Sequence, residues 1–167
     1  MIDTARSIRQ DVANNINHLD SSRGSSSFAK TVVINPVKSA QFRNDQASIL
    51  RLSEKEILIA YSQYFNSTED GTNISIATSK STDNGLTFPA STRIDTNIYV
   101  PSLYQKGNKI GCIYLKKSGT LLNQVWEMES ADGGATWINN RMIVGTTTSY
   151  YSPTSNVIYR KGGKLYY

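Results

Sequence analysis

Two different hydrophobic periods divide the chain near residue 30. Between residues 2 and 19, apolar residues recur every three or four positions, as they do along one face of an α-helix. From residue 31 onward the period changes to two, with the short apolar runs that are typical of β-strands. The pattern predicts a short N-terminal helix over residues 1–20 and an all-β domain over residues 31–167. The Ser-rich residues 21–30 between them predict a flexible linker.

The predicted N-terminal helix needs a partner for its apolar stripe, because an isolated helix of this length is only marginally stable in water. The stripe consists of Ile2, Ala5, Ile8, Val12, Ile16 and Leu19. Three partners remain open at this stage. The helix docks onto its own β-domain, it forms a bundle with copies of itself, or it anchors the chain on another protein.

The predicted strands recur with a period of about 50 residues, the period of a β-propeller blade with some four strands. The first series covers residues 31–35, 47–52, 56–65, 73–81 and 91–95. The second covers residues 100–105, 109–116, 124–130 and 140–145, and the third begins with residues 155–161 and 164–167. The segments "ASILRLSEKEILIAYS", "PSLYQKGNKIGCIYLK" and "SNVIYRKGGKLYY" align as three copies of strand, tight turn and strand.

An octet follows the predicted strand at residues 73–81 in the first series and the one at residues 124–130 in the second, and it predicts a tight turn. It reads "STDNGLTF" over residues 81–88 and "SADGGATW" over residues 130–137. Its Asp can accept hydrogen bonds from backbone N–H groups of its own turn, and its Gly supplies a positive φ. The shared residues are Ser81, Asp83, Gly85, Thr87 and Phe88, and Ser130, Asp132, Gly134, Thr136 and Trp137. We interpret them as structural, since the acidic series of an EF-hand calcium loop is absent.

The octet resembles the Asp-box of sialidases and sialidase-like β-propellers, and residues 40–167 resemble the blades around it. The resemblance implies an Asp-box propeller of about five or six blades, of which about two and a half are present. In that family an arginine cluster holds the sugar carboxylate, a tyrosine paired with a glutamate is the nucleophile, and an aspartate is the acid/base.

The resemblance implies two weak catalytic candidates in this chain. Arg43 lies in "QFRNDQASIL", where the family has Phe-Arg-Ile-Pro, but Ile-Pro is missing here. Arg43 either is redirected to the propeller axis by a bulge or is a surface arginine. Asp70 in "FNSTEDGTN" falls at the acid/base position, or else is a solvated loop residue. Four tyrosines are candidates for stacking on sugar rings, or for packing between sheets: Tyr61, Tyr64, Tyr99 and Tyr151.

Composition and charge argue against several other classes of function. The net charge is +5 without any Lys/Arg run, which argues against nucleic-acid binding. The single Cys112 forms no intrachain disulfide and is expected to be a buried small hydrophobe. With Cys112 and His18 as the only residues of their types, the chain predicts no soft-ligand metal site. No cofactor-binding motif is present, and no apolar stretch is long enough for a membrane span or a signal peptide.

Two functions of different class fit the sequence. The first is the propeller of a phage tail fibre or receptor-binding protein that attaches to host surface glycan. It would sit on the virion, possess a trimeric N-terminal helix and contact other virion proteins. The second is a sialidase-like exo-glycosidase, cytoplasmic or secreted without a visible signal peptide. The missing Ile-Pro, the leading helix and the missing leader favour the first, and another sialidase-like or structural propeller is the third possibility.

Overall fold

The computed structural model describes residues 43–66, 73–118, 122–144, 159–161 and 164–166, all within a compact unit from Val33 to Tyr167. The predicted helix, linker and first strand over residues 1–35 lie outside the described residues. So do Asp70 and Tyr151.

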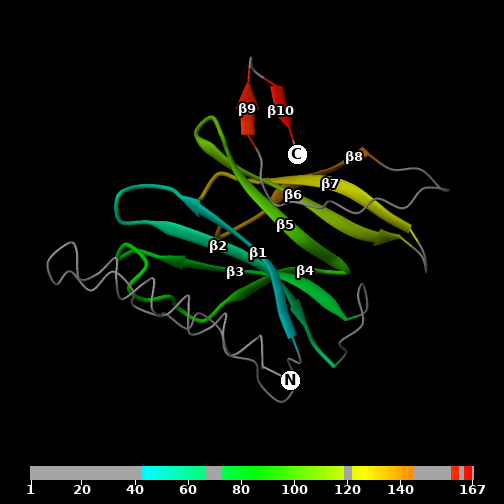
Figure 1. The fold of residues 1–167 in the computed structure, drawn as a ribbon, viewed down its shortest axis with the longest axis horizontal. Helices are drawn as coiled ribbons and strands as arrows, with labels where there is room; N and C mark the ends of the chain where they lie inside the picture. Colours follow the sequence, from blue (N-terminus) through cyan, green and yellow to red (C-terminus); the bar gives the residue numbers. More distant parts are fainter. Residues whose placement is uncertain (1–42, 67–72, 119–121, 145–158, 162–163, 167) are drawn as a thin grey trace, which may run out of the picture. The chain divides into compact units, whose positions relative to one another are not determined.

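The described residues form antiparallel β-structure in three sheets (Figure 1). The first sheet has the order β1 (Arg43–Arg51), β2 (Ile57–Tyr64), β3 (Ile74–Ser81) and β4 (Thr92–Thr96). The second has the order β5 (Ile98–Lys106), β6 (Lys109–Ser118), β7 (Leu122–Ser130) and β8 (Ile138–Val144). A hairpin of β9 (Tyr159–Lys161) and β10 (Lys164–Tyr166) is the third. The all-β prediction is confirmed over these ranges.

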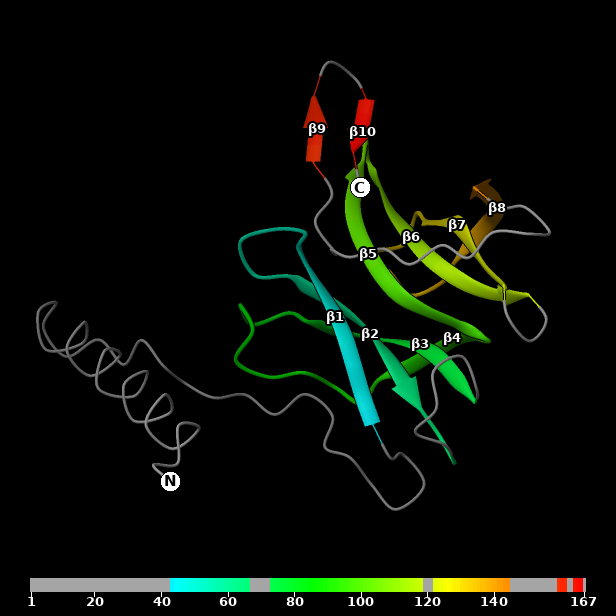
Figure 2. The same cartoon turned by 45° about the vertical axis from the view of Figure 1, so that its right-hand side comes forward.

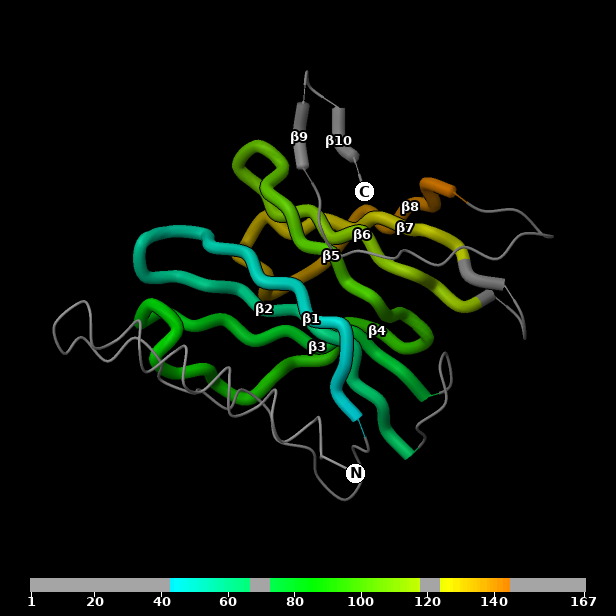
Figure 3. Tube along the Cα trace, in the orientation of Figure 1, coloured from blue at the N-terminus to red at the C-terminus, as the bar shows by residue number. Residues whose placement is uncertain are grey.

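The two four-stranded sheets share one register, so the sequence repeat is also a structural repeat. Ile57 pairs with Ser81 in the first sheet, and Ile110 pairs with Ser130 in the second. The β5–β6 and β9–β10 hairpins also correspond, because each closes on a pair of lysines. Figure 3 shows the β1–β2 and β5–β6 hairpins as two similar long loops of the trace.

The start of β1 differs from the prediction. The sequence predicts a strand from residue 47, whereas β1 begins at Arg43. Its pairing with β2 shifts register between Asp45 and Ser48, which marks a β-bulge. A bulge adds a residue to one strand, so the period-two pattern is interrupted there and the polar residues before it do not look like a strand.

Apolar side chains of both sheets form one core. The first sheet contributes Leu58, Ala60 and Ile76, and the second contributes Leu103, Ile110, Cys112, Tyr114 and Met128. Cys112 is fully buried, as expected, and burial raises the pKa of its thiol to about 12. The thiol is therefore a packing group rather than a nucleophile.

Each octet is a turn closed by its own side chains. In the first, the Asp83 carboxylate accepts bonds from the Thr87 amide at 2.9 Å and the Thr87 hydroxyl at 2.5 Å, while the Ser81 hydroxyl donates to it at 2.7 Å. The bond from the Thr87 hydroxyl, then the one from its amide, hold the pKa of Asp83 at about 2.

The second octet repeats these bonds with Ser130, Asp132 and Thr136, at 2.7, 2.9 and 2.5 Å. The same hydrogen bonds, from the Thr136 hydroxyl first, lower the pKa of Asp132. Each carboxylate is engaged in holding its own turn.

Candidate functional site

The first strands of the two four-stranded sheets carry a bulge at the same place. Register shifts between Asp45 and Ser48 in β1 and between Tyr99 and Ser102 in β5. The residue after Asp45, Gln46, has φ 47°, and the residue after Tyr99, Val100, has φ 53°. A positive φ is a genuine outlier for a β-branched residue and costs about 1–3 kcal/mol. Bulges of this kind redirect side chains and are common next to functional sites.

Arg43 is held in place on the first of these strands. Its guanidinium lies over the ring of Tyr64, 3.9 Å from the centroid, and its Nη2 is 3.2 Å from Asp45 Oδ2. About a third of each charged side chain is exposed, 35% for Arg43 and 38% for Asp45. Arg43 is therefore an oriented arginine, and the bulge that the sequence analysis allowed for follows it directly.

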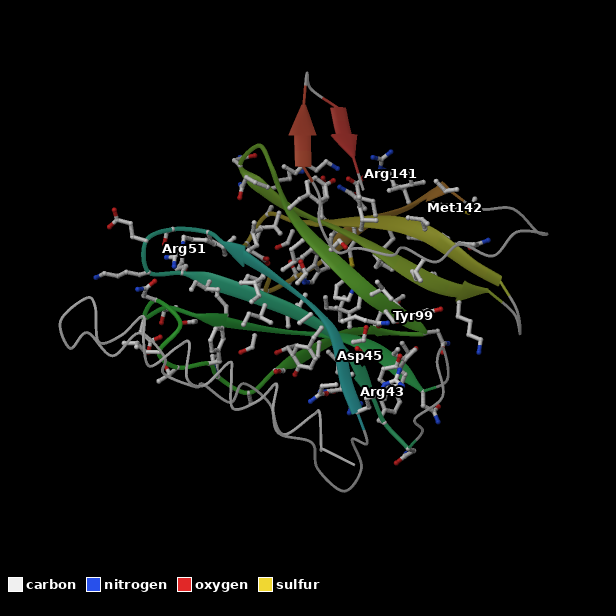
Figure 4. The ribbon with its side chains drawn as sticks, in the orientation of Figure 1. Arg43, Asp45, Arg51, Tyr99, Arg141 and Met142 are labelled. Atoms are coloured by element: carbon white, nitrogen blue, oxygen red, sulfur yellow. The ribbon has the colours of Figure 1, made fainter. Side chains whose placement is uncertain are left out.

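We call Arg43, Asp45, Tyr64 and Tyr99 the bulge site. The two tyrosines belong to one buried cluster, in which Tyr64 comes from β2 and Tyr99 from the start of β5. Figure 4 labels Arg43 and Asp45 on β1 and Tyr99 on β5. The site thus combines residues from both four-stranded sheets.

The described tyrosine candidates pack inside the protein. Tyr61, Tyr64 and Tyr99 are 5%, 0% and 6% exposed, and Tyr61 donates its hydroxyl hydrogen to Ser91 Oγ at 2.6 Å. Such burial leaves no ring face for a sugar to stack on. This corrects the stacking interpretation for these three residues in favour of the packing alternative.

Sequence reasoning missed two polar partners of the bulge site, Asp45 and Ser62. Asp45 Oδ1 accepts a hydrogen bond from the backbone N–H of Gln46 at 2.7 Å. Ser62 is fully buried between the two bulges. No local signal marks either residue, because their roles depend on a bulge and on a neighbouring sheet.

A second polar cluster lies on the second sheet, toward the β5–β6 turn. The Glu127 side chain is 4% exposed and accepts hydrogen bonds from Lys106 Nζ at 3.0 Å, from Arg141 Nε at 2.5 Å and from the Tyr104 hydroxyl. Burial alone raises the pKa of Glu127, but the bonds from Tyr104, Lys106 and Arg141 outweigh it, so the pKa lies below its ordinary value. Burial, and then the bond to Glu127, raise the pKa of the Tyr104 hydroxyl.

The neighbouring Glu129 shows that this cluster belongs to the repeat. Glu129 pairs with Lys109 at 2.7 Å, and at the matching place of the first sheet Lys80 pairs with Glu56 at 3.2 Å, with the charges exchanged. The charged residues of this cluster thus pair with one another, which indicates that the cluster has a structural role.

The described ranges contain neither a cluster of metal-binding side chains nor a membrane-spanning helix. There, no group of three or more His, Cys, Asp or Glu side chains is placed to hold a metal ion. The same part of the chain contains no helix with the length and apolarity of a membrane span.

No family model matches the sequence, and no curated protein matches it. Solved structures do match the fold. The Hadza microbial sialidase Hz136 aligns with a TM-score of 0.55 and 16% identity over 62% of this chain and 26% of that chain. The fold is sialidase-like.

Two further solved structures align with this sialidase-like chain. Zg3597, a family 117 glycoside hydrolase of the marine bacterium Zobellia galactanivorans, has a TM-score of 0.55 and 11% identity over 72% of this chain and 46% of that chain. A protein of unknown function from Dyadobacter fermentans has a TM-score of 0.50 and 20% identity over 65% and 38%. The chain spans less than half the length of each of the three structures.

Proposed function

We propose that this protein is a carbohydrate-recognising β-propeller in which Arg43 binds an acidic group of the sugar. The observation that carries the proposal is the orientation of Arg43 by the Tyr64 ring and the Asp45 carboxylate, with about a third of the guanidinium side chain exposed. A guanidinium oriented in this way forms paired, charge-assisted hydrogen bonds with a carboxylate. The sialidase-like fold supports a carbohydrate as the ligand.

Replacing Arg43 should selectively weaken binding of a carboxylated sugar. We expect Arg43→Lys to lower the affinity for the methyl α-glycoside of N-acetylneuraminic acid about tenfold, because lysine keeps the charge and loses the planar pair of donors. Isothermal titration calorimetry measures the change. Arg51→Lys is the matched control, since Arg51 lies at the other end of β1 and bonds Ser53, Glu54 and Asn84 (Figure 4).

Three results would contradict this proposal. They are no binding of the acidic sugar by the unaltered protein, unchanged binding by Arg43→Lys, and an equal loss in Arg51→Lys. The alternative, a sialidase-like exo-glycosidase, has the support that two of the solved neighbours are named as a sialidase and a glycoside hydrolase. Turnover of a fluorogenic sialoside that is abolished by Asp70→Asn would establish the enzyme.

We further propose that the propeller belongs to a phage tail fibre or receptor-binding protein, attaches to host surface glycan, and trimerises through residues 1–20. The apolar stripe of that segment supports the trimer. We expect the intact chain to scatter light as a trimer, and a chain without residues 1–25 to scatter as a monomer. An unchanged mass per particle after the deletion would refute this assembly.

A further inference from the structure

We propose that Ser62 is a positioning residue that joins the two strand bulges and thereby fixes the orientation of Arg43 for ligand binding. The inference rests on the proposed function of Arg43 and adds a residue from the neighbouring strand that does not itself meet the sugar. It follows from one chain of hydrogen bonds that crosses from the second sheet to the first.

The first link of the chain ties Ser62 to the bulge of the second sheet. The Val100 amide donates to Ser62 Oγ at 2.9 Å, and both residues are buried. Val100 has φ 53°, a conformation that a valine keeps only where its surroundings enforce it. The Ser62 hydroxyl accepts the hydrogen bond of the Val100 amide in this strained conformation. It therefore stabilises the second bulge and the position of the adjacent Tyr99.

The second link ties Ser62 to the bulge of the first sheet. The Ser62 hydroxyl donates to Gln46 Oε1 at 3.0 Å. A hydroxyl has one hydrogen to donate and lone pairs to accept, so the two links use Ser62 in the two ways available to it. One hydroxyl therefore joins two residues that both have a positive φ.

The remaining links lead from Gln46 to the charged residues. The backbone N–H of Gln46 donates to Asp45 Oδ1 at 2.7 Å, and the other carboxylate oxygen, Oδ2, is 3.2 Å from Arg43 Nη2. The path thus runs through hydrogen bonds and one ion pair, and it ends on the guanidinium of Arg43, whose side chain is 35% exposed. Figure 2, a second view, shows β5 running beside β1, the two strands that the path connects.

A matched control lies at a second contact between the two sheets, from β1 to β5. Ser48 Oγ accepts a bond from the Leu103 amide at 2.9 Å, and Ser48 is also buried. Ser48 and Ser62 thus both satisfy a buried amide of β5 from the first sheet. Only the Ser62 hydroxyl also donates to Gln46 at the Arg43 bulge. Replacing either serine by alanine should weaken the packing between the sheets. Only the replacement of Ser62 should also change the orientation of Arg43.

The test compares Ser62→Ala with Ser48→Ala by two readouts. The first is the Nε–H resonance of Arg43 in a nitrogen–proton correlation spectrum, assigned by its disappearance in Arg43→Lys. The second is the affinity for the methyl α-glycoside of N-acetylneuraminic acid. We expect Ser62→Ala to shift the Arg43 resonance and to lower the affinity about tenfold. Ser48→Ala should lower the midpoint temperature of unfolding as much as Ser62→Ala does, but it should change neither the resonance nor the affinity.

A second variant keeps the test decisive if Ser62→Ala does not fold. Gln46→Met removes the acceptor of the Ser62 hydroxyl without touching Val100, and it should shift the resonance and weaken binding in the same direction. Equal behaviour of the Ser62 and Ser48 variants in both readouts, or an unchanged Arg43 resonance in Gln46→Met, would overturn the proposal. If the unaltered protein does not bind the acidic sugar, the proposed function fails, and the resonance comparison still decides whether Ser62 positions Arg43.

Discussion

Gly134→Ala should lower the free energy of unfolding by about 3 kcal/mol, the sum of a backbone cost and a packing cost. Gly134 has φ 94°, where any side chain is strained. A Cβ there would stand 2.8 and 2.9 Å from the two methyl carbons of Leu58, which is buried in the core between the sheets. The second octet packs so closely on the first sheet that its turn has room for glycine alone.

Denaturant unfolding of Gly134→Ala and Gly107→Ala separates the two costs. Gly107 also has a positive φ, of 63°, but a Cβ at that position would meet nothing within 4 Å. We expect Gly107→Ala to cost about 1 kcal/mol, which is the backbone cost alone. A Gly134→Ala protein that is no less stable than Gly107→Ala would show that the octet does not pack on Leu58 as described.

Gly111→Ala should have a comparable effect, again about 3 kcal/mol, through a clash of another kind. A Cβ at Gly111 would clash with Cζ of Tyr104 and lie 2.6 Å from its Oη, because the tyrosine ring crosses over the glycine. The ring is rigid and buried, so it must turn away, and Glu127 then loses the hydrogen bond from the Tyr104 hydroxyl. The substitution therefore combines overpacking with the loss of a bond to a buried carboxylate.

A double-mutant cycle tests this explanation. The first sheet has Leu50 opposite Leu58, where the second has Tyr104 opposite Gly111. In a Tyr104→Leu protein, Gly111→Ala should cost less than about 0.5 kcal/mol or even stabilise the strand, since alanine loses less backbone entropy on folding than glycine. If Gly111→Ala is equally costly with tyrosine and with leucine at position 104, the ring is not the cause.

The strands and turns of this protein were largely predictable, because their signals are local. The lysine-flanked turns, the octets and the alternating apolar residues each lie within one short stretch, and β2, β3, β5, β6 and β7 fall close to their predicted ranges. The start of β1 was missed because a bulge interrupts the alternation. The octet interpretation also needed no tertiary information, since Asp83 and Asp132 bond residues of their own turns.

The candidate site was only partly predictable. Arg43 was found through a family resemblance. Tyr64 was named for another role, and Asp45 was missed, because the contacts of both with Arg43 depend on the bulge and on pairing between β1 and β2. Of the four tyrosines proposed for sugar stacking, the three that the structure describes, Tyr61, Tyr64 and Tyr99, proved to be buried. An aromatic residue on a strand has the same sequence signature whether its ring faces solvent or a neighbouring sheet.

The sequence by itself determined the repeat, the all-β class and the self-closing octet turns, since each depends on contacts between residues a few positions apart. Tertiary structure alone decided that Tyr61, Tyr64 and Tyr99 are buried, that Gly134 lies against Leu58, and that Ser62 meets both Gln46 and Val100. Those contacts join residues from separate strands and sheets. Their identity depends on where the sheets pack against one another and on two bulges, and neither leaves a periodic trace in the chain.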